Sequence, residues 1–350
     1  MNATVTPWLK KLEESIDLDW ERRKLRTWKD VLDFTPVDGC FEVYRSIGGR
    51  KPGEWPVIPI NQAIADPAQM LLRELRSVYD VVCQKTYHVP NIRCNYGTCI
   101  LPSLFGAETF WMDDQLDTLP TNKPLGEAAI DRLIDAGVPD LNNGFGRRVF
   151  ETVEYFKETL TDYPKIAEAV WIYHPDLQGP IDVVELLWGS DMFYAFYDQP
   201  QKVKAITDLV TQTYVHFMKR WMELVPPRDK VYSAHWGRFW KGQVVLRDDS
   251  IVNLSNEMYE EFVKPYDERI LGQFGGGVIH FCGHADHCID SLTESRGLTA
   301  INPSQPHLND MRKIHAASVG KGIILDCPNS RHLAGLDLTR GVVLSSPAED

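Results

Sequence analysis

The chain has 350 residues, of which 43% are hydrophobic, and its formal net charge is −12. One α/β barrel is a domain of ordinary size at this length, although two smaller domains would also fit. The acidic balance repels phosphate groups, so we expect neither nucleic acid nor an anionic membrane surface as a partner. No apolar run approaches the roughly 20 residues that a membrane-spanning helix needs, and residues 1–19 lack the apolar centre of a signal peptide.

The cysteine content bears on the compartment. There are seven cysteines. An odd number in a long chain without an export signal is typical of free thiols in a reducing compartment, so we expect a cytoplasmic protein. In such a chain, a cysteine beside a histidine is a candidate metal ligand.

The N-terminal residues differ from the rest of the chain. Residues 1–55 carry a charged run, Glu21-Arg22-Arg23-Lys24, and a Gly/Pro-rich stretch at 48–53. We expect an irregular N-terminal extension here that caps the main domain and offers a contact for a homodimer. The main domain is then expected over residues 56–350.

Short apolar segments in residues 56–350 predict strands. In the first part they lie at 57–60, 91–94, 169–173 and either 231–234 or 244–247. In the last part they lie at 278–282, 298–302, 322–326 and 341–344, with starts about 20 residues apart. Helix-compatible segments at 285–293 and 308–319 fill two of the gaps, and strands that alternate with helices predict a parallel sheet.

A helix is expected immediately before the last group of strands. Ser255 can cap it, and apolar residues four apart, from Phe262 to Phe274, share one face of residues 258–274, with a kink at Pro265. A total of about eight strands favours a closed (β/α)8 TIM barrel. The alternative is an open doubly wound sheet, but no G-x-G-x-x-G follows any predicted strand.

Polar side chains gather at the predicted carboxyl ends of the strands, where parallel barrels place their active sites. Loops in general favour Ser, Lys and Glu, whereas His, Cys, Asn and Asp dominate here, so we favour an enzyme over ordinary polar loops. Amide, aromatic and acidic side chains at these ends are the expected substrate contacts: Asn95, Tyr96, Gln178, Trp236, Asp248, Asn302 and Gln305.

Two residues are candidates for proton transfer. Asp249 follows a predicted strand directly after Asp248, and adjacent acids suit a general base, a substrate anchor or a cation ligand. His235 ends another strand candidate. The alternative for the acid pair is a favourable interaction with the dipole of a following helix.

The pair His280 and Cys282 predicts a metal site. Residues two apart on a strand point to the same side, and an imidazole beside a thiol suits zinc. The alternative is a buried cysteine and a histidine with its polar atoms satisfied in the core. Catalytic zinc needs a third protein ligand, for which we expect Cys327, with Asp326, His284 or His287 as further options.

Several of these segments resemble a known family. They are the run Asp248 to Ser255 with its continuation at 258–266, the run His280-Phe281-Cys282-Gly283, and the segments Asn95-Tyr96-Gly97-Thr98 and Gly179-Pro180. Together they are similar to the superfamily that contains uroporphyrinogen decarboxylase and the corrinoid-dependent methyltransferases. The resemblance runs from about Val57 to the C-terminus and implies a TIM barrel with its site at the mouth.

The resemblance favours the methyltransferase branch. The decarboxylase branch carries an arginine-rich segment near its first strand, whereas residues 56–63 contain no arginine. The methyltransferase branch holds zinc through an H-x-C pair and a distant cysteine. His280 and Cys282 match that pair, but the last predicted strand runs into Leu344-Ser345-Ser346-Pro347 with no cysteine, which leaves Cys327 as the substitute.

The resemblance therefore implies transfer of a methyl group between a small molecule and a separate corrinoid protein, with zinc as a Lewis acid and Asp249 or His235 handling the proton. The D-x-H-x-x-G signature of cobalamin binding is absent, so we expect the cobalamin on a partner protein. Two rivals remain open. One is a metal-free decarboxylase that acts on another carboxylate, and the other is a non-catalytic barrel that binds a ligand.

Overall fold

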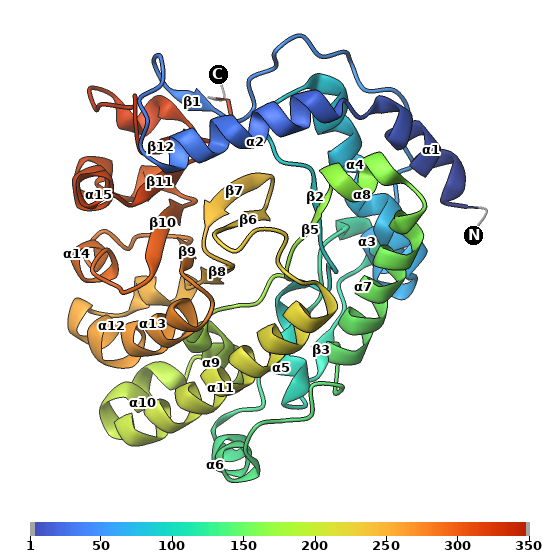
Figure 1. Ribbon diagram of the computed structural model, residues 1–350. Coiled ribbons are helices and arrows are strands. Elements are labelled where there is room, and N and C mark those ends of the chain that lie inside the picture. The colour runs from blue at the N-terminus through green and yellow to red at the C-terminus, as the bar shows by residue number, and fades with distance from the viewer. Residues whose placement is uncertain (1–3, 348–350) are drawn as a thin grey trace.

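A parallel sheet of six strands, surrounded by helices, organises the molecule (Figure 1). The computed structural model describes residues 4–347. The order of strands in the sheet is β1-β12-β11-β10-β9-β8. The strand bounds are β1 Phe41–Glu42, β2 Asn91–Ile92, β3 Thr109–Phe110, β4 Thr121–Asn122, β5 Trp171–Ile172, β6 Tyr232–His235, β7 Arg238–Lys241, β8 Val244–Arg247, β9 Gly277–Phe281, β10 Leu298–Pro303, β11 Ile324–Cys327 and β12 Val342–Leu344.

A second parallel pair, β2 with β5, faces the six-stranded sheet across the ring of elements (Figure 1). Single backbone hydrogen bonds link the two parts. Tyr87 N donates to Val43 O at 2.9 Å beside β1 and β2, and Gly179 N donates to Arg247 O at 2.7 Å beside β5 and β8. The chain is therefore a mixed α/β protein with an arrangement compatible with an α/β barrel.

The strands predicted at the C-terminal end are confirmed, and one predicted at the start is wrong. No strand forms at 57–60, because Pro56 and Pro59 have no N–H to donate and Ile60 instead begins helix α3. The strand beside β12 is β1, with Phe41 opposite Val343. Residues expected as an irregular extension thus contribute a strand to the sheet.

Side chains of the sheet alternate between the two faces, as the strand period requires. Val245, Val278, Ala300 and Ile324 pack together inside the ring. Their neighbours Leu246, Ile279, Ile301 and Leu325 belong to the larger core between the sheet and the helices. The parity of a residue on its strand therefore decides whether it faces the ring interior or the helices.

An antiparallel hairpin, β6 with β7, occupies the interior of the ring (Figure 1). Phe239 and Trp240 of β7 pack against the interior side chains of the sheet. The turn consists of Trp236 and Gly237, with φ of +51° and +75°, and two positive φ values are the mark of a type I′ hairpin turn. Of the two strand alternatives at 231–234 and 244–247, the second supplies the sheet strand β8 and the first lies in this hairpin.

The helices cover the outside of the ring, and α2 packs its Trp28, Val31 and Leu32 on the interior cluster at one end. Ser255 caps α12 as predicted, but the expected single helix is broken at Val263, and Pro265 lies in the first turn of the second helix, α13. The helix bounds are α1 Thr6–Ser15, α2 Leu18–Leu32, α3 Ile60–Ala65, α4 Pro67–Gln84, α5 Ile100–Leu104, α6 Glu127–Ala136, α7 Gly146–Thr161, α8 Pro164–Ala169, α9 Pro180–Trp188, α10 Met192–Asp198, α11 Pro200–Leu224, α12 Asn256–Phe262, α13 Lys264–Gln273, α14 Ile289–Leu292 and α15 Met311–Ser318. Among residues 4–347, no helix has the length and apolar character that crossing a bilayer requires.

Candidate functional site

Four neighbouring strands place a row of polar side chains on the interior face of the sheet. Arg247 on β8 lies opposite His280 on β9, and His280 lies opposite Asn302 on β10. Asp326 on β11 follows in the same row, one residue after the pair Ile301 and Leu325. Each of these four residues stands two positions after an apolar interior residue of its own strand, which is Val245, Val278, Ala300 or Ile324. The row of polar side chains therefore lies directly next to the apolar interior cluster, on its carboxyl-terminal side.

Hydrogen bonds along this row fix the histidine. Arg238 Nε lies 2.9 Å from Asp326 Oδ2, and Asn302 Nδ2 donates to the same oxygen at 2.8 Å. The Asn302 oxygen therefore turns to His280 Nδ1, at 2.6 Å, and accepts its hydrogen. This arrangement leaves the lone pair of His280 on Nε2.

His280 Nε2 faces a thiol and a carboxylate. It lies 3.4 Å from Cys282 Sγ and 3.8 Å from Asp249 Oδ1. Asp249 Oδ1 also accepts a hydrogen bond from Cys282 N at 2.7 Å, and Ser304 Oγ donates to Cys282 Sγ at 3.0 Å. One donor atom from each of Asp249, His280 and Cys282 lies within 4.8 Å of the others. Sulfur, nitrogen and oxygen donors at this spacing, with the imidazole oriented by Asn302, fit a zinc ion.

Burial sets the protonation of this group. Desolvation lowers the pKa of His280, so the neutral imidazole with a free lone pair is favoured. Desolvation raises the pKa of Cys282, and the hydrogen bond from Ser304 partly offsets that shift. The thiol of Cys282 therefore keeps its proton at neutral pH unless a metal ion displaces the proton or a base removes it.

Asp182, on α9, positions Asp249 and was not predicted from the sequence. Its carboxylate accepts hydrogen bonds from Asp249 N at 2.9 Å and Ser250 N at 2.8 Å, at the start of the short 3₁₀ helix Asp249–Asn253. Burial, followed by the nearby charge of Asp249, raises the pKa of Asp182 to about 7. Its sequence signal is modest: it is an acid in the first turn of a helix that begins at Pro180.

The hairpin turn brings a second polar network to the same place. The Trp236 indole meets the His280 ring edge to face, with centroids 5.2 Å apart, and its Nε1 donates to Asp176 Oδ1 at 3.2 Å. The Arg247 guanidinium lies over the Trp236 ring, 4.4 Å from its centroid. Asp176 is buried between Arg93 and Arg247 and is bonded to both. These three charged residues were not anticipated from the sequence, because their pairing depends on strands far apart in the chain.

His235, expected to handle a proton, lies beside this network. Its side chain is 2% exposed, and its Nε2 lies 3.8 Å from Asp176 Oδ1. Its ring packs on His174 and Trp236, with centroids 4.6 and 4.7 Å apart. Desolvation lowers the pKa of His235, so it is neutral at ordinary pH. His235 is thus near the site but enclosed.

Cys327, expected as the third metal ligand, does not join the group. Asp326 points into the ring, so the next residue on the strand points to the helices, and Cys327 is part of the outer core. Its Sγ donates to Asn329 O at 3.3 Å, and burial raises its pKa to about 12. Asp249 occupies the place expected for Cys327.

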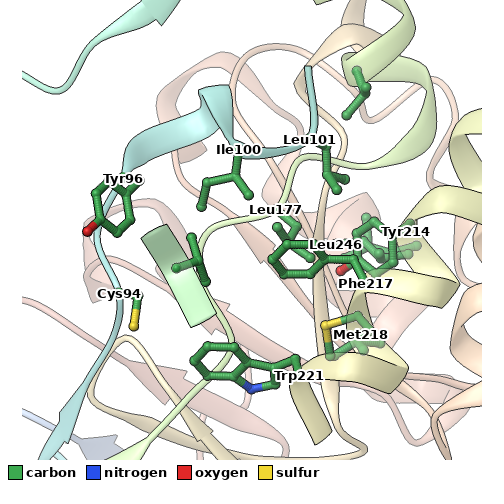
Figure 2. Close-up of a cluster of buried hydrophobic side chains, with 14 of the residues drawn as sticks. Cys94, Tyr96, Ile100, Leu101, Leu177, Tyr214, Phe217, Met218, Trp221 and Leu246 are labelled. Carbon is green, nitrogen blue, oxygen red and sulfur yellow. The ribbon is translucent and has the colours of Figure 1, made fainter. Parts of the chain in front are cut away.

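Asp248 and Tyr96, both expected to contact substrate, also face away from the ring. Asp248 is 0% exposed, and a Cβ added at Gly179 would lie 1.9 Å from its Oδ1. Tyr96 is 1% exposed, and its hydroxyl lies 2.7 Å from Thr152 Oγ1. Figure 2 shows Tyr96 at the edge of a buried cluster with Ile100. Neither residue lies on a strand: Asp248 follows the end of β8, and Tyr96 precedes the short 3₁₀ helix Gly97–Cys99.

The remaining predicted substrate contacts are spread around the mouth. Asn95 is half-buried, and its Nδ2 donates to Glu74 Oε1 at 3.0 Å. Gln178 is half-buried just before Gly179, and Gln305 is exposed in the loop after β10. Asn302 and Trp236 are therefore the two predicted contacts that the structure brings to His280.

A cavity of about 660 Å³ reaches the same place from the side of α4 and β2. Its walls include Arg73 and Val78 of α4, Arg93, and Tyr173. Trp236 and Gly237 of the hairpin turn also line it. Trp236 therefore both lines this cavity and contacts the ring of His280.

Comparison with solved structures shows a similarity in fold. The chain is similar in structure to a methyltransferase from Methanosarcina mazei, with a TM-score of 0.64 and 15% sequence identity over 93% of this chain and 91% of that one. This likeness concerns the fold. No protein-family model matches the sequence, and no curated protein matches it.

Proposed function

We propose that this protein transfers a methyl group between a small molecule and a corrinoid carried by a separate protein. The observation that carries the proposal is the convergence of Asp249, His280 and Cys282, whose donor atoms lie within 4.8 Å of one another at the carboxyl ends of parallel strands. The fold shared with a protein described as a methyltransferase supports the same reaction class. The barrel and H-x-C resemblance to corrinoid-dependent methyltransferases supports the carrier.

The proposal includes closure of the ring. We infer that the six-stranded sheet and the β2–β5 pair are two arcs of one (β/α)8 barrel. The backbone hydrogen bonds from Tyr87 to Val43 and from Gly179 to Arg247 support this, because they bridge the two gaps between the arcs. The carboxyl ends of all eight strands would then share one mouth, and the group at His280 would lie in it.

His280, Cys282 and Asp249 would hold the zinc, with Asp249 in the role expected of Cys327. Zinc bound there would act as a Lewis acid toward the sulfur or oxygen that gains or loses the methyl group. Asn302 keeps the lone pair of His280 on Nε2, and Ser304 orients the Cys282 sulfur. Asp249 has two oxygens, so one can be a ligand while the other accepts the proton of an incoming thiol or hydroxyl. We favour Asp249 over the enclosed His235 for this proton.

The small molecule would approach through the cavity that Trp236 helps to line. The cobalamin would arrive on a partner protein, because the chain carries no D-x-H-x-x-G motif. The seven cysteines are all free thiols, which supports a cytoplasmic setting. A homodimer through the N-terminal segment remains part of the proposal.

A spectroscopic assay tests the function. Zinc-loaded protein is mixed with free cob(I)alamin and a panel of methyl donors, namely methanol, methylated thiols, methylamines and methyl aryl ethers. We expect one donor to convert the cobalt absorption spectrum to that of methylcobalamin. Cys282→Ala should abolish the conversion, whereas Cys40→Ala, a half-buried cysteine outside the group, should not. No conversion with any donor, with free cobalamin or with a carrier protein from the same source, would count against methyl transfer.

One observation favours a second candidate, decarboxylation of a carboxylate substrate. Arg93 and Arg247 both pair with Asp176, yet each keeps one buried guanidinium nitrogen, Arg93 Nε and Arg247 Nη1, without a hydrogen-bond partner among residues 4–347. Such donors would suit a substrate carboxylate. Release of carbon dioxide from a carboxylate by metal-free protein without cobalamin would establish this candidate and displace the first. A chain that binds ligands but turns over neither substrate class would be the non-catalytic barrel.

A further inference from the structure

A second group of potential metal ligands lies in the loop that follows β9. His284, Asp286 and His287 each offer one donor atom, and these atoms lie within 4.8 Å of one another. The group shares no residue with the Asp249, His280 and Cys282 group and contains no thiol. The sequence suggested His284 and His287 only as spare ligands for the first site.

His287 is already arranged as a ligand. Its Nε2 lies 2.8 Å from Leu254 O, and since a carbonyl oxygen only accepts, Nε2 carries the hydrogen. The lone pair is therefore on Nδ1, which is buried and has no hydrogen-bond partner among residues 4–347. A buried lone pair without a partner is costly, whereas an imidazole held through its other nitrogen by a backbone carbonyl is the usual arrangement at a metal.

Asp286 and His284 complete the donor set. Asp286 Oδ2 accepts a hydrogen bond from Asp310 N at 2.6 Å, which leaves Oδ1 directed to His284 Nε2 at 2.9 Å. His284 is 60% exposed, so a cation can reach this side from solvent. An ordinary ion pair explains the contact of Asp286 with His284, but it does not explain the unpartnered His287 Nδ1.

The loop itself is held in place by Asn309. Its Oδ1 accepts from Ala285 N at 2.9 Å, and its Nδ2 donates to Gly283 O at 2.8 Å. With the anchors at Leu254 and Asp310, three loops that follow β8, β9 and β10 meet at this point. The donor atoms are therefore positioned before any ion binds, which lowers the ordering cost of binding.

We propose that His284, Asp286 and His287 form a second site for a divalent transition metal, separate from the first. Two imidazoles and one carboxylate suit zinc, cobalt or nickel and leave coordination positions for water. An ion bound there would join the three mouth loops. The proposal does not depend on the methyl-transfer reaction.

Cobalt(II) separates the two sites, because a thiolate ligand gives an intense sulfur-to-cobalt charge-transfer band and an imidazole–carboxylate site does not. We expect metal-free protein to bind two equivalents of Co²⁺. In Cys282→Ala the charge-transfer band should disappear, while one equivalent with weak ligand-field bands remains. Adding His287→Ala to that variant should weaken the remaining binding by at least about tenfold. Adding His216→Ala, an exposed histidine on α11, should leave it unchanged.

Asp286→Asn provides an independent second variant if His287→Ala fails to fold. Thermal unfolding gives a further measurement, because an ion that binds only the native state raises the midpoint. Co²⁺ should raise the midpoint of Cys282→Ala, and this rise should be lost with either added substitution. The inference is overturned if Cys282→Ala binds no Co²⁺, or if its binding is the same with and without His287→Ala.

Discussion

The side-chain oxygen of Asn302 lies 2.6 Å from His280 Nδ1, and this contact determines which nitrogen of the histidine is free. Asn302 cannot reverse its amide, because its nitrogen is committed to Asp326, which lies against Arg238. The orientation of the His280 lone pair is thus set by a residue that touches neither Cys282 nor Asp249. Ligand orientation from a neighbouring strand is how many metal sites gain affinity.

The first prediction concerns this contact. Asn302→Leu removes the acceptor for His280 Nδ1 but keeps a side chain of similar size. We expect zinc affinity to fall by about 10- to 100-fold, because the imidazole loses its orientation. Titration against a fluorescent zinc chelator measures the change. Asn142→Leu, at an exposed loop residue, is the control. Equal affinities for the two variants would contradict the role of Asn302.

The second prediction concerns the hairpin turn. Gly237 has φ of +75°, and an added Cβ would lie 3.0 Å from His88 Cδ2. Gly237→Ala should therefore lower the free energy of unfolding by about 1–2 kcal/mol. The same change in a helix should act oppositely: Gly272→Ala, on α13 with nothing within 4 Å of the new Cβ, should raise it by about 0.5–1 kcal/mol. Urea unfolding measures both, and a Gly237→Ala protein as stable as the parent would refute the turn assignment.

The third prediction concerns Asp176. Burial raises its pKa, but the charges of Arg93 and Arg247 outweigh burial and hold the pKa at about 2. Because the pKa is lowered in the native state, the stabilisation is present above the ordinary value of 3.8 and is lost as pH falls from there toward 2. Asp176→Asn leaves two buried guanidinium groups without their counter-ion and should cost about 3–5 kcal/mol at pH 7.

The control for Asp176 is a surface pair. Asp131 is 65% exposed and pairs with Lys202, so Asp131→Asn should cost less than about 1 kcal/mol. Urea unfolding at pH 7 compares the two variants. If Asp176→Asn and Asp131→Asn lower the free energy of unfolding by the same small amount, Asp176 is not a buried counter-ion.

The fourth prediction concerns Asp267 on α13. It is 0% exposed, and neither carboxylate oxygen has a hydrogen-bond partner among residues 4–347. Burial, followed by the charge of Asp182, raises its pKa above the ordinary value of 3.8. The native state then holds the proton of Asp267 more tightly than the unfolded state. The stabilisation of the native state by this proton is therefore fully present below the ordinary pKa, and it is lost as pH rises through the raised pKa of the native state.

Asp267→Asn removes this ionisation and should raise the free energy of unfolding at pH 8. The gain is about 1.4 kcal/mol for each unit by which the pKa is raised. At pH 4 the change should be much smaller, because the carboxyl is protonated in the native state and only partly ionised in the unfolded state, whose pKa is near the ordinary 3.8. Asp135→Asn, at an exposed position, should change the free energy of unfolding by the same small amount at pH 4 and pH 8. A gain of the same size at pH 4 and pH 8 would show that charge is not the cause.

Strand periodicity predicted the strands at 278–282, 298–302, 322–326 and 341–344, because each is a short apolar run between turn residues. It also placed His280, Asn302 and Asp326 together, and hydrogen bonds now link the three. The prediction of a strand at 57–60 was wrong, because an apolar composition does not compensate for two prolines that have no N–H group to donate. The true edge strand, Phe41–Glu42, is too short to produce a periodic signal.

The candidate site was predictable only in part, for a geometric reason. Residues i and i+2 on one strand must share a face, so the pairing of His280 with Cys282 followed from the sequence. Which residue of another segment would join them depends on which face of its strand it occupies, and Cys327 points outward because it follows the inward-facing Asp326. Asp176 with Arg93 and Arg247, and Asp182 with Asp249, connect elements far apart in the chain, and no local pattern encodes such pairs.

The β6–β7 hairpin comes directly before β8 in the chain, and its open end, at Tyr232 and Lys241, lies opposite its turn. Its length and its two turn residues can therefore change without altering the register of any parallel strand. The donor atoms of Asp249, His280 and Cys282 belong to the parallel strands and the segments that follow them. Trp236 and Arg238 belong to the hairpin and can be substituted without moving those strands. Variation confined to about ten residues could thus give relatives of this protein different substrate preferences while the parallel strands stay the same.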